Sequence, residues 1–383
     1  MFSDLIQLPV NWVDGMKITR SHFQQTENYV NEQLRETTAQ QLTDFNFGIL
    51  PADRALELTV FCDLNQQVNV ELSSCRAITP NGSRVQVTAA DGIRLNASFP
   101  ELAAKYALQT ATSQNLYISL TVDPFQRLPF GEPLVNEDPP RHPYTRPGIR
   151  LDLLPAAQIN TAQMGSSLVI GKITWQNGEL LSIKEFIPSC ATVGSLPSLA
   201  AWYVKFRQML ENWEQHCIRI IQKINSKIQS QQPNALSNNI FKLTEKTLDH
   251  LICQKAVLQW ILPKTAPIHL CATLIGNIQY VHTILKCFPE KEREEMINYF
   301  AEWTDVQAGL FDNQSLRAFQ LQYNHYDIAQ ALTEIEQIID TYVQVFFKLS
   351  QLEFIGKRKG QNVFVVEQEL PNNNNNSRWS PLI

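Results

Sequence analysis

The chain has 383 residues, 44% of them hydrophobic and 18% charged, with a formal net charge of −5. This length favours two or three domains over a single core. A weak negative charge spread over the whole chain excludes the basic surface that nucleic-acid-binding domains carry. We therefore expect no nucleic-acid partner.

The first residues, MFSDLIQLPVNW, have neither the basic start nor the apolar run of a signal peptide, and no apolar run is long enough to cross a bilayer. We expect a cytoplasmic protein that does not itself span a membrane. The 7 cysteines show no paired spacing, which is typical of reduced thiols. Only 14 glycines are present, which argues against glycine-rich phosphate loops, so we expect no nucleotide or other cofactor.

The N-terminal half predicts one helix followed by many short strands. A Thr or Ser within 19–21 caps a helix that runs to about Leu42 and turns Phe23, Val30 and Leu34 towards a core. Alternating apolar residues then predict strands near 56–62, 68–72, 85–87, 116–122, 168–175 and 180–187, with turn signals at 80–83, 91–92 and 177–178. The pattern indicates an antiparallel β-sandwich in the first 190 residues.

A proline-rich stretch interrupts this half. Residues 123–150 contain prolines at 124, 129, 133, 139, 140, 143 and 147. We expect this segment to be extended and unable to join a central strand. A loop of this length usually has a role outside the core. It is interpreted either as an arm that contacts a neighbouring subunit or as a solvent-exposed excursion or a disordered segment.

The second half predicts a helical bundle. Two helices carry an unbroken heptad seam, one at 199–224 and one at 328–349, with further helices near 236–262, 268–288 and 290–303. The first seam packs either within its own chain or between chains, and its strict repeat slightly favours a shared, coiled-coil-like trunk. Its residues are Leu199, Tyr203, Phe206, Leu210, Trp213, Cys217, Ile220 and Ile224.

The C-terminal residues predict a small hairpin and a tail. Short β-like runs at 354–355 and 363–366 flank a basic turn, and five asparagines at 372–376 predict a disordered tail. Lys357, Arg358 and Lys359 in the turn and Trp379 in the tail are candidate docking residues.

No catalytic or metal-binding constellation emerges. A zinc site built from His250, Cys253, His269 and Cys271 has spacings that match no zinc motif. His216 and Cys217 are adjacent on a helix and point about 100° apart, which disfavours a base and nucleophile pair. The carboxylates of Glu132, Glu137 and Asp138 lie on the proline-rich stretch without a rigid frame. We expect no enzyme, no metal and no catalytic residue.

Three strings carry a family resemblance. Residues 9–25 read PVNWVDGMKITRSHFQQ, which is similar to the opening signature V-x-W-x-x-G-M-x-L-x-P-Q-H-F-Q of TssK, the trimeric baseplate protein of type VI secretion systems. Residues 186–190 (FIPSC), followed by 196–199 (LPSL), resemble the family's F-I-P-P-C and S-P-x-L strings, and residues 323–327 (YNHYD) resemble a weaker one. The resemblance spans most of residues 9–330.

The resemblance implies a fold and an assembly. It implies a β-sandwich shoulder related to phage receptor-binding proteins, a helical neck and a C-terminal head, assembled as a homotrimer that binds the TssF/TssG wedge and reaches a membrane complex. The matching residues that it offers for wedge contact are Trp12, Gly15, Met16, His22 and Phe23.

The chain also departs from the family pattern. Arg20 and Ser21 replace the usual Pro-Gln before His-Phe, and fewer than 60 residues follow Asp327, which is short for the family's head. We therefore expect a short-headed variant with a shoulder at 1–190, a helical neck at 191–305, a reduced head of helix plus hairpin at 306–370 and a disordered tail at 371–383.

The sequence thus predicts a structural baseplate adaptor. The trimer would link the wedge to the membrane-anchoring complex and lie peripherally at the inner membrane through the assembled machine. The alternative is a trimeric, phage-like receptor-binding or tail-fibre protein that recognises a glycan on the sandwich.

Overall fold

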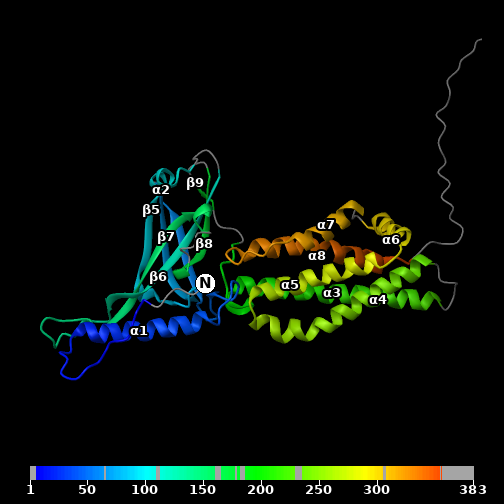
Figure 1. The fold of residues 1–383 in the computed structure, drawn as a ribbon. Helices are drawn as coiled ribbons and strands as arrows, with labels where there is room; N and C mark the ends of the chain where they lie inside the picture. The colour runs from blue at the N-terminus through cyan, green and yellow to red at the C-terminus, as the bar shows by residue number, and fades with distance from the viewer. Residues whose placement is uncertain are drawn as a thin grey trace, which may run out of the picture.

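The chain folds into antiparallel sheets followed by helices, which confirms the predicted order of a β part and then an α part (Figure 1). The computed structural model describes residues 6–63, 66–108, 113–159, 165–176, 179–181, 186–228, 235–304, 308–353 and 355. In Figure 1 the sheets form one end of the molecule, and the long helices lie side by side at the other end.

The first sheet is organised around one long strand, β3 (Gln67–Ile78), to which four other strands pair antiparallel. Val68, Val70 and Leu72 alternate with less buried residues, so the predicted period of two is correct here. The partners of β3 are β1 (Gly48–Ile49), β2 (Leu56–Cys62), β4 (Arg84–Val87) and β5 (Ile93–Ser98).

The second sheet shares its core with the first. Its order is β7 (Tyr144–Pro155), β6 (Gln114–Phe130), β8 (Ser167–Gln176) and β9 (Glu179–Leu181). A Cβ on Gly171 of β8 would lie only 2.7 Å from Leu58 Cδ2 of β2, so the two sheets are in close contact there. Helix α2 (Phe99–Tyr106) covers one end of this core, where the rings of Phe99 and Trp175 stack with centroids 4.1 Å apart.

The three turn signals have different outcomes. The signal at 80–83 is confirmed, because it joins β3 to β4 in an antiparallel pair, and the signal at 177–178 lies outside the described residues. Asp91 and Gly92 do not close a hairpin, because β4 and β5 both pair with β3 and not with each other. Gly92 instead ends a short 3-10 helix in the left-handed conformation. Strand β5 and helix α2 lie where the sequence predicted neither.

The proline-rich segment is extended, as expected, but both of its ends are strand, so the expectation of a long loop is wrong. β6 continues to Phe130 and β7 begins at Tyr144, and the two pair as far as Phe130 with Tyr144. Beyond Asp123, β6 pairs with β7 alone, and the register shift between Asp123 and Leu128 takes up Pro124. Prolines are tolerated in such a ribbon because its outer edges have no neighbouring strand that needs an N–H donor. We call residues 123–150 the arm.

Helix α1 (Arg20–Ala39) begins where predicted but faces the opposite way. The expected core residues Phe23, Val30 and Leu34 are 59%, 48% and 63% exposed, whereas Glu32 on the opposite side is fully buried. The prediction failed because the strands offer α1 polar partners: Arg127 of β6 donates a hydrogen bond to Asn28 Oδ1 at 2.9 Å.

The second half is a bundle in which the two predicted heptad seams face each other. Helices α3 and α8 form the most extensive helix pair, and Trp213 of α3 lies against Tyr342 and Phe346 of α8 with ring centroids 6.0 and 5.5 Å apart. The helices are α3 (Pro197–Ile228), α4 (Ala235–Ala256), α5 (Pro267–Lys286), α6 (Glu290–Trp303), α7 (Ala308–Gln320) and α8 (Ile328–Gln351). A π-helical turn at Val257–Ile261 and a 3-10 turn at Leu262–Lys264 end α4.

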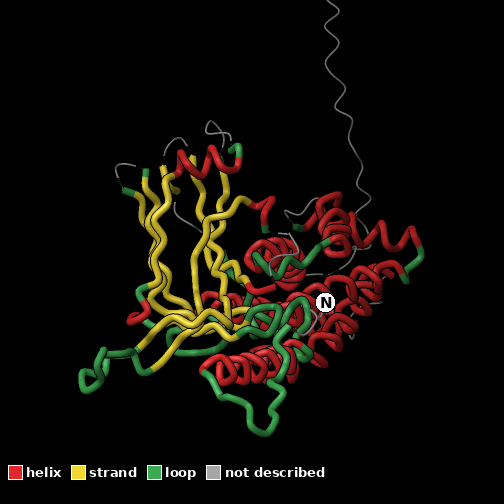
Figure 2. The backbone as a smooth tube through the Cα atoms, turned by 60° about the vertical axis from the view of Figure 1, so that its left-hand side comes forward, coloured by secondary structure: helices red, strands yellow, loops and turns green. Residues whose placement is uncertain are grey.

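The first seam is covered within its own chain. All eight of its residues, from Leu199 to Ile224, are at most 8% exposed in the single chain, packed between α4 and α8. The slight preference for a trunk shared between chains is therefore wrong. Its strict heptad repeat therefore matches a partner helix in the same molecule. Figure 2 shows the helices of the bundle gathered beside the sheets.

Helices α7 and α8 pack on α3 and α5 and share one core with them. The predicted boundary at residue 306 between neck and reduced head stays a prediction. The hairpin expected at 354–366, except the buried Ile355, and the tail at 371–383 lie outside the described residues.

Shortening a seam residue tests this packing. Leu210 is 4% exposed, so Leu210→Ala should lower the free energy of unfolding by about 2–5 kcal/mol, since it leaves a cavity between α3 and its neighbours. Urea unfolding followed by far-ultraviolet circular dichroism measures the loss.

Val204→Ala is the matched control, because Val204 lies on the same helix and is 51% exposed. It should change stability by no more than about 0.5 kcal/mol. Equal effects at the two positions would contradict the packing described here.

Candidate functional site

The residues before α1 fold back along it, and we call residues 6–19 the N-terminal hook. Gln25 Nε2 donates to the carbonyl oxygen of Leu8 at 2.6 Å, and the backbone N–H of Ile6 donates to Glu32 Oε1 at 3.1 Å. The chain reverses at Val13–Met16, where Gly15 has a φ of +76° that favours glycine. Glu32 is thereby used as an internal acceptor that fixes the hook to the inner side of α1.

The five candidate wedge residues lie together at the turn of the hook and the first turn of α1. Trp12 is 51% and Phe23 59% exposed, and the ring of Trp12 meets the ring of His22 edge to face at 5.9 Å. Neither Trp12 nor Phe23 is a core residue. They form an exposed apolar group with Val13 and Ile18, which are 59% and 60% exposed.

His22 has a structural task at the same place. The backbone N–H of Thr19 donates to His22 Nδ1 at 3.1 Å, which satisfies a group at the helix start. Arg20 and Ser21, which depart from the family string, occupy the first turn of α1 without interrupting it. The presence of Arg20 and Ser21 in place of the family's Pro-Gln therefore does not move the start of the helix.

The base of the arm lies against the first turns of α1. Arg127 donates hydrogen bonds to the carbonyl oxygen of Gln24 at 3.3 Å and to Asn28 Oδ1 at 2.9 Å, and it forms an ion pair with Glu27. An open hollow of about 460 Å³ between the two elements is lined by Ile18, Thr19, Arg20, Phe23, Gln24, Glu27, Arg127 and Thr145.

Further along the arm, Val135 and Tyr144 are 86% and 68% exposed. The hook and the arm thus present apolar side chains at the same end of the molecule, away from the bundle (Figure 1). Sequence reasoning missed Arg127, because an arginine within a predicted loop gives no sign of its partners. The expected contact of the arm with a neighbouring subunit stays a prediction.

The other two family strings meet at the joint between the sheets and the bundle. His325 is 4% exposed; its Nε2–H donates to the carbonyl oxygen of Phe47 at 3.0 Å, and its Nδ1 accepts from the hydroxyl of Tyr323 at 2.8 Å. Ser189 Oγ in turn donates to the carbonyl oxygen of His325 at 3.0 Å. The string at 186–190 and the string at 323–327 are therefore bonded to each other.

Two further contacts tie α8 to the sheets. The backbone N–H of Ile328 donates to the carbonyl oxygen of Ile187 at 3.0 Å, and Lys172 Nζ of β8 lies 3.0 Å from Asp327 Oδ2. Asp327 is 7% exposed, so the ion pair is shielded from solvent at its carboxylate end. These contacts hold the start of α8 against the β part.

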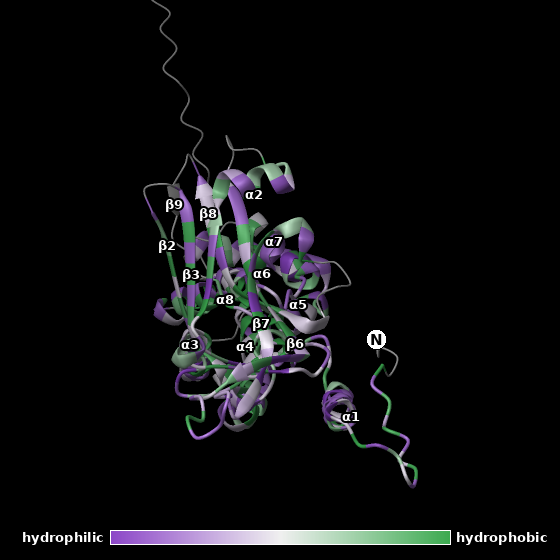
Figure 3. Ribbon diagram, turned by 90° about the vertical axis from the view of Figure 1, so that its left-hand side faces the viewer, coloured by the Kyte–Doolittle hydropathy of each residue, from purple (hydrophilic) through white to green (hydrophobic). Residues whose placement is uncertain are grey.

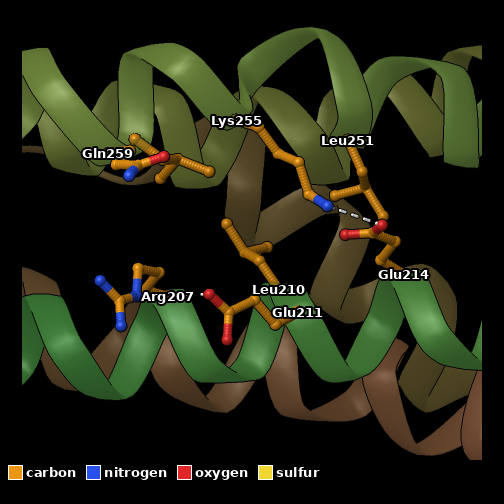
Figure 4. Close-up of a pocket in the computed structure, with 8 residues that line it drawn as sticks. Arg207, Leu210, Glu211, Glu214, Leu251, Lys255 and Gln259 are labelled. Atoms are coloured by element: carbon orange, nitrogen blue, oxygen red, sulfur yellow. Dashed lines mark hydrogen bonds and ion pairs between the residues drawn. The ribbon is translucent and has the colours of Figure 1, made fainter.

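A second hollow of about 350 Å³ lies between α3 and the end of α4 (Figure 4). Leu210, Leu251 and Leu258 supply its apolar lining. Its charges are paired: Lys255 Nζ reaches across to Glu214 Oε1 at 2.8 Å, and Arg207 lies 3.3 Å from Glu211 on the same helix. The remaining lining residue is Gln259. This arrangement places no nucleophile beside a base.

The residues considered for metal or catalysis have other partners or lie apart. The ring of His250 stacks on Tyr280 with centroids 4.0 Å apart and shares a hydrogen bond with Gln254. Cys253 is exposed, whereas Cys271 and Cys217 are buried. Within the described ranges, no group of three or more His, Cys, Asp or Glu is placed to hold a metal ion.

No helix in the described part of the chain is both long and apolar enough to cross a membrane. The docking candidates Lys357, Arg358, Lys359 and Trp379 lie outside the described residues.

The joint predicts a pH dependence of stability. Burial lowers the pKa of His325 from 6.5 to about 4, so the folded protein holds this ring neutral. Because the unfolded chain binds the proton more readily, this contribution to stability is full above about pH 6.5 and is lost as the pH falls to about 4. The loss is about 3 kcal/mol.

His325→Gln isolates this effect, since an amide can donate to Phe47 and accept from Tyr323 without titrating. Urea unfolding at pH 7 and pH 4.5 should show a smaller fall in stability for the variant than for the parent protein. Equal falls in the two proteins would show that His325 does not account for the pH dependence.

Comparison with known proteins gives similarity at the level of solved structures. No protein-family model and no curated protein matches the chain. A crystal structure of TssK is similar at 14% sequence identity over 86% of this chain and 69% of that chain, with a TM-score of 0.47. TssK from the EAEC type VI secretion system, in complex with a nanobody, is 13% identical over 82% of this chain and 98% of its own, with a TM-score of 0.46.

A third similar structure is a chain of the TssK-TssF-TssG baseplate subcomplex of a type VI secretion system. It is 12% identical over 88% of this chain and 99% of that chain, with a TM-score of 0.45. The chain is thus similar to solved structures of the family that its three sequence strings resemble.

Proposed function

We propose that this chain is a structural, non-enzymatic baseplate adaptor of a type VI secretion system. As a homotrimer, it would link a wedge of TssF- and TssG-like proteins to the membrane-anchoring complex. The observation that carries the proposal is the hook. Residues 9–25, the string that resembles the TssK signature, form an exposed apolar turn in which Trp12 and Phe23 face solvent.

The placement of the hook supports its use in wedge contact. A monomeric protein seldom leaves a group of large apolar side chains exposed without a partner. Trp12, Val13, Ile18 and Phe23 form such a group, and the ion pair between Arg127 and Glu27 fixes the arm beside it. Tryptophan is one of the residue types that dominate the energy of protein interfaces, and phenylalanine is enriched at their cores.

The two ends of the molecule suggest two directions of contact. We assign the wedge to the end that carries the hook and arm, and the envelope side to the far end of the bundle (Figure 1). In this proposal residues 1–190 form the shoulder, 191–305 the neck, 306–370 the reduced head and 371–383 the tail. The adaptor acts at the cytoplasmic side of the inner membrane. The joint at His325 holds its two ends in a fixed relative orientation.

Binding through three identical hooks strengthens the attachment of such an adaptor to the wedge. Three hooks held by one trimer bind a wedge with an effective concentration set by the trimer itself, so avidity exceeds the affinity of a single hook. One hook offers only a few apolar side chains, so its own affinity for the wedge is weak. Three hooks that bind together give a strong attachment.

Removing the central aromatic residue tests the proposal. Trp12→Ala should weaken co-purification with the TssF- and TssG-like proteins by about 10-fold or more, because it removes an exposed anchor. The melting temperature of the variant should stay close to that of the parent chain. Pull-down of the full chain with the wedge proteins, quantified at several concentrations, gives the measurement.

Trp260→Ala is the matched control, because Trp260 is 68% exposed and lies on the bundle, away from the hook. It should leave wedge binding unchanged. The proposal fails if light scattering shows a monomer at micromolar concentration, or if the parent chain binds a glycan saturably and no wedge protein.

A further inference from the structure

The hollow between α3 and the end of α4 has the size and the lining of a binding site for one large side chain. Its volume of about 350 Å³ lies within the range of ligand pockets, and Leu210, Leu251 and Leu258 form its apolar floor. Figure 4 shows Lys255 reaching over this floor from α4 to Glu214 of α3. We call this hollow the α3/α4 groove, and its two helices run side by side in Figure 1 and Figure 3.

The wall of the groove formed by α4 departs from a regular helix. The turn at Val257–Ile261 is π-helical, and the hydroxyl of Tyr203 on α3 donates to the carbonyl oxygen of Leu258 at 2.7 Å. Turns of this kind occur frequently at functional sites. Because this hydrogen bond ties the turn to α3, the groove is a fixed feature of the bundle.

Exposed apolar side chains continue the groove on both helices. Val204 is 51% exposed and lies one helical turn before the lining residue Arg207. Ile252 and Trp260, which are 49% and 68% exposed, are each next in sequence to a lining residue of α4 or of the π-helical turn. A group of apolar side chains of this kind on a protein surface marks a binding site.

We propose that the α3/α4 groove binds the C-terminal segment of its own chain, residues 377–383, with Trp379 as the anchor. This segment reads SRWSPLI and lies outside the described residues. The asparagines at 372–376 precede it as a polar spacer. The inference does not depend on the adaptor function, because it concerns a contact within one chain.

The distance to the groove suits this segment. Lys223 of α3 donates to the carbonyl oxygen of Leu352 at 2.8 Å, and Ile355 is 4% exposed, so the chain leaves the bundle near Lys223. Leu210 lies 13 residues before Lys223 on α3, which is about 20 Å along the helix axis. Trp379 lies 24 positions after Ile355, and a flexible chain of that length has a root-mean-square end-to-end distance of about 25–29 Å.

Phe364, the other aromatic residue after Ile355, is too close to the bundle. It lies only 9 positions after Ile355, for which the same relation gives about 15–18 Å. The path to the groove is longer than this, because it runs along α3 and also around it. The effective concentration of a tethered group is highest when the length of the tether matches the span. This favours Trp379 as the anchor.

The rim of the groove offers a partner to each polar group of the segment. Arg207 and Lys255 lie on opposite helices, and a cation beside the face of an indole ring is attractive. A buried indole N–H needs an acceptor, which the side-chain amide oxygen of Gln259 provides. The side chain of Glu211 is 57% exposed and can accept from the guanidinium of Arg378.

The tether makes a modest affinity sufficient. A short linker gives the segment an effective concentration of about 1 mM at the groove. If the separate segment binds with a Kd of about 100 µM, the tethered segment occupies the groove in about nine chains of ten. A peptide added from outside must then compete with it, so its apparent affinity falls about 10-fold.

Trp379→Ala tests the occupancy of the groove. A fluorescein-labelled peptide of residues 377–383 should bind the full-length variant about 10-fold more tightly than the parent chain, because the tail of the variant no longer competes. Fluorescence anisotropy at increasing protein concentration measures both constants. Ser377→Ala in the same tail is the matched control and should bind the peptide as weakly as the parent chain. Equal constants for Trp379→Ala and the parent, or no binding to either at about 1 mM protein, would overturn the inference.

A charge reversal at the rim tests where the peptide binds. In the Trp379→Ala chain, Glu211→Arg should weaken peptide binding about 5-fold or more, because it sets a like charge against Arg378. Glu245→Arg, the same change at an exposed residue of α4, should leave the constant unaltered. Far-ultraviolet circular dichroism should be the same for all variants. Equal effects of the two reversals would show a general effect of charge and refute the contact at the groove.

A photoreactive phenylalanine derivative at residue 379 shows which chain the segment binds. Irradiation of the full chain should join residue 379 to 207–214 or 251–259 in a product that runs as a monomer on a denaturing gel, and mass spectrometry identifies the joined peptides. A product of two chains joined at this groove would refute docking within one chain and assign the segment to a neighbouring copy. Products that map elsewhere would refute the groove as its site.

Discussion

The polar inner side of α1 is the constraint on which the candidate surfaces depend. Glu32 is buried; it accepts backbone N–H groups from the hook and lies 3.5 Å from Arg35. Burial of a carboxylate is costly unless hydrogen bonds satisfy it, so this side of the helix and the hook hold each other in place. Since the polar side of α1 is bonded inward, the side that carries its apolar residues must face outward. The exposure of Phe23, Val30 and Leu34 is thus a consequence of how the helix is anchored.

The joint at His325 is also held by the hydrogen bonds of a buried polar side chain, but this side chain is uncharged. A neutral imidazole is fully bonded by one donor and one acceptor, Tyr323 and the carbonyl of Phe47, and therefore fits a buried site without carrying charge there. Its neighbours Asp327 and Lys172 do carry charge, and they are paired. Because hydrogen bonds are directional, this joint fixes the orientation of the sheets relative to the bundle as well as the contact between them. It gives a rigid connection between the sheets that carry the hook and the bundle that extends away from it.

The elements whose periodicity is decided by core packing could be predicted from the sequence. The alternation in β3 and the heptads of α3 and α8 identified buried faces correctly, because the hydrophobic effect dominates wherever a strand or helix lies against a large apolar neighbour. The arm could not be predicted as strand, since prolines exclude a strand only where both edges are paired, and pairing on one edge is a property of the tertiary fold. Arg127, which fixes the arm to α1, gave no local signal for the same reason. The hook residues were found through a resemblance, and their proximity to one another follows from the turn at Gly15.

The heptads of α3 and α1 show what a periodic pattern can and cannot establish. The seam of α3 and the exposed residues 20, 23, 27, 30, 34 and 37 of α1 both follow intervals of three and four, the spacing that suits a facing helix. For α3 that helix is α8 of the same chain, which lies against it after the intervening helices α4 to α7. For α1 no described segment is free to do so, since the hook occupies its inner side and the arm its first turns. Periodicity specifies the geometry of a partner, whereas the connectivity of the fold decides whether that partner belongs to the same molecule.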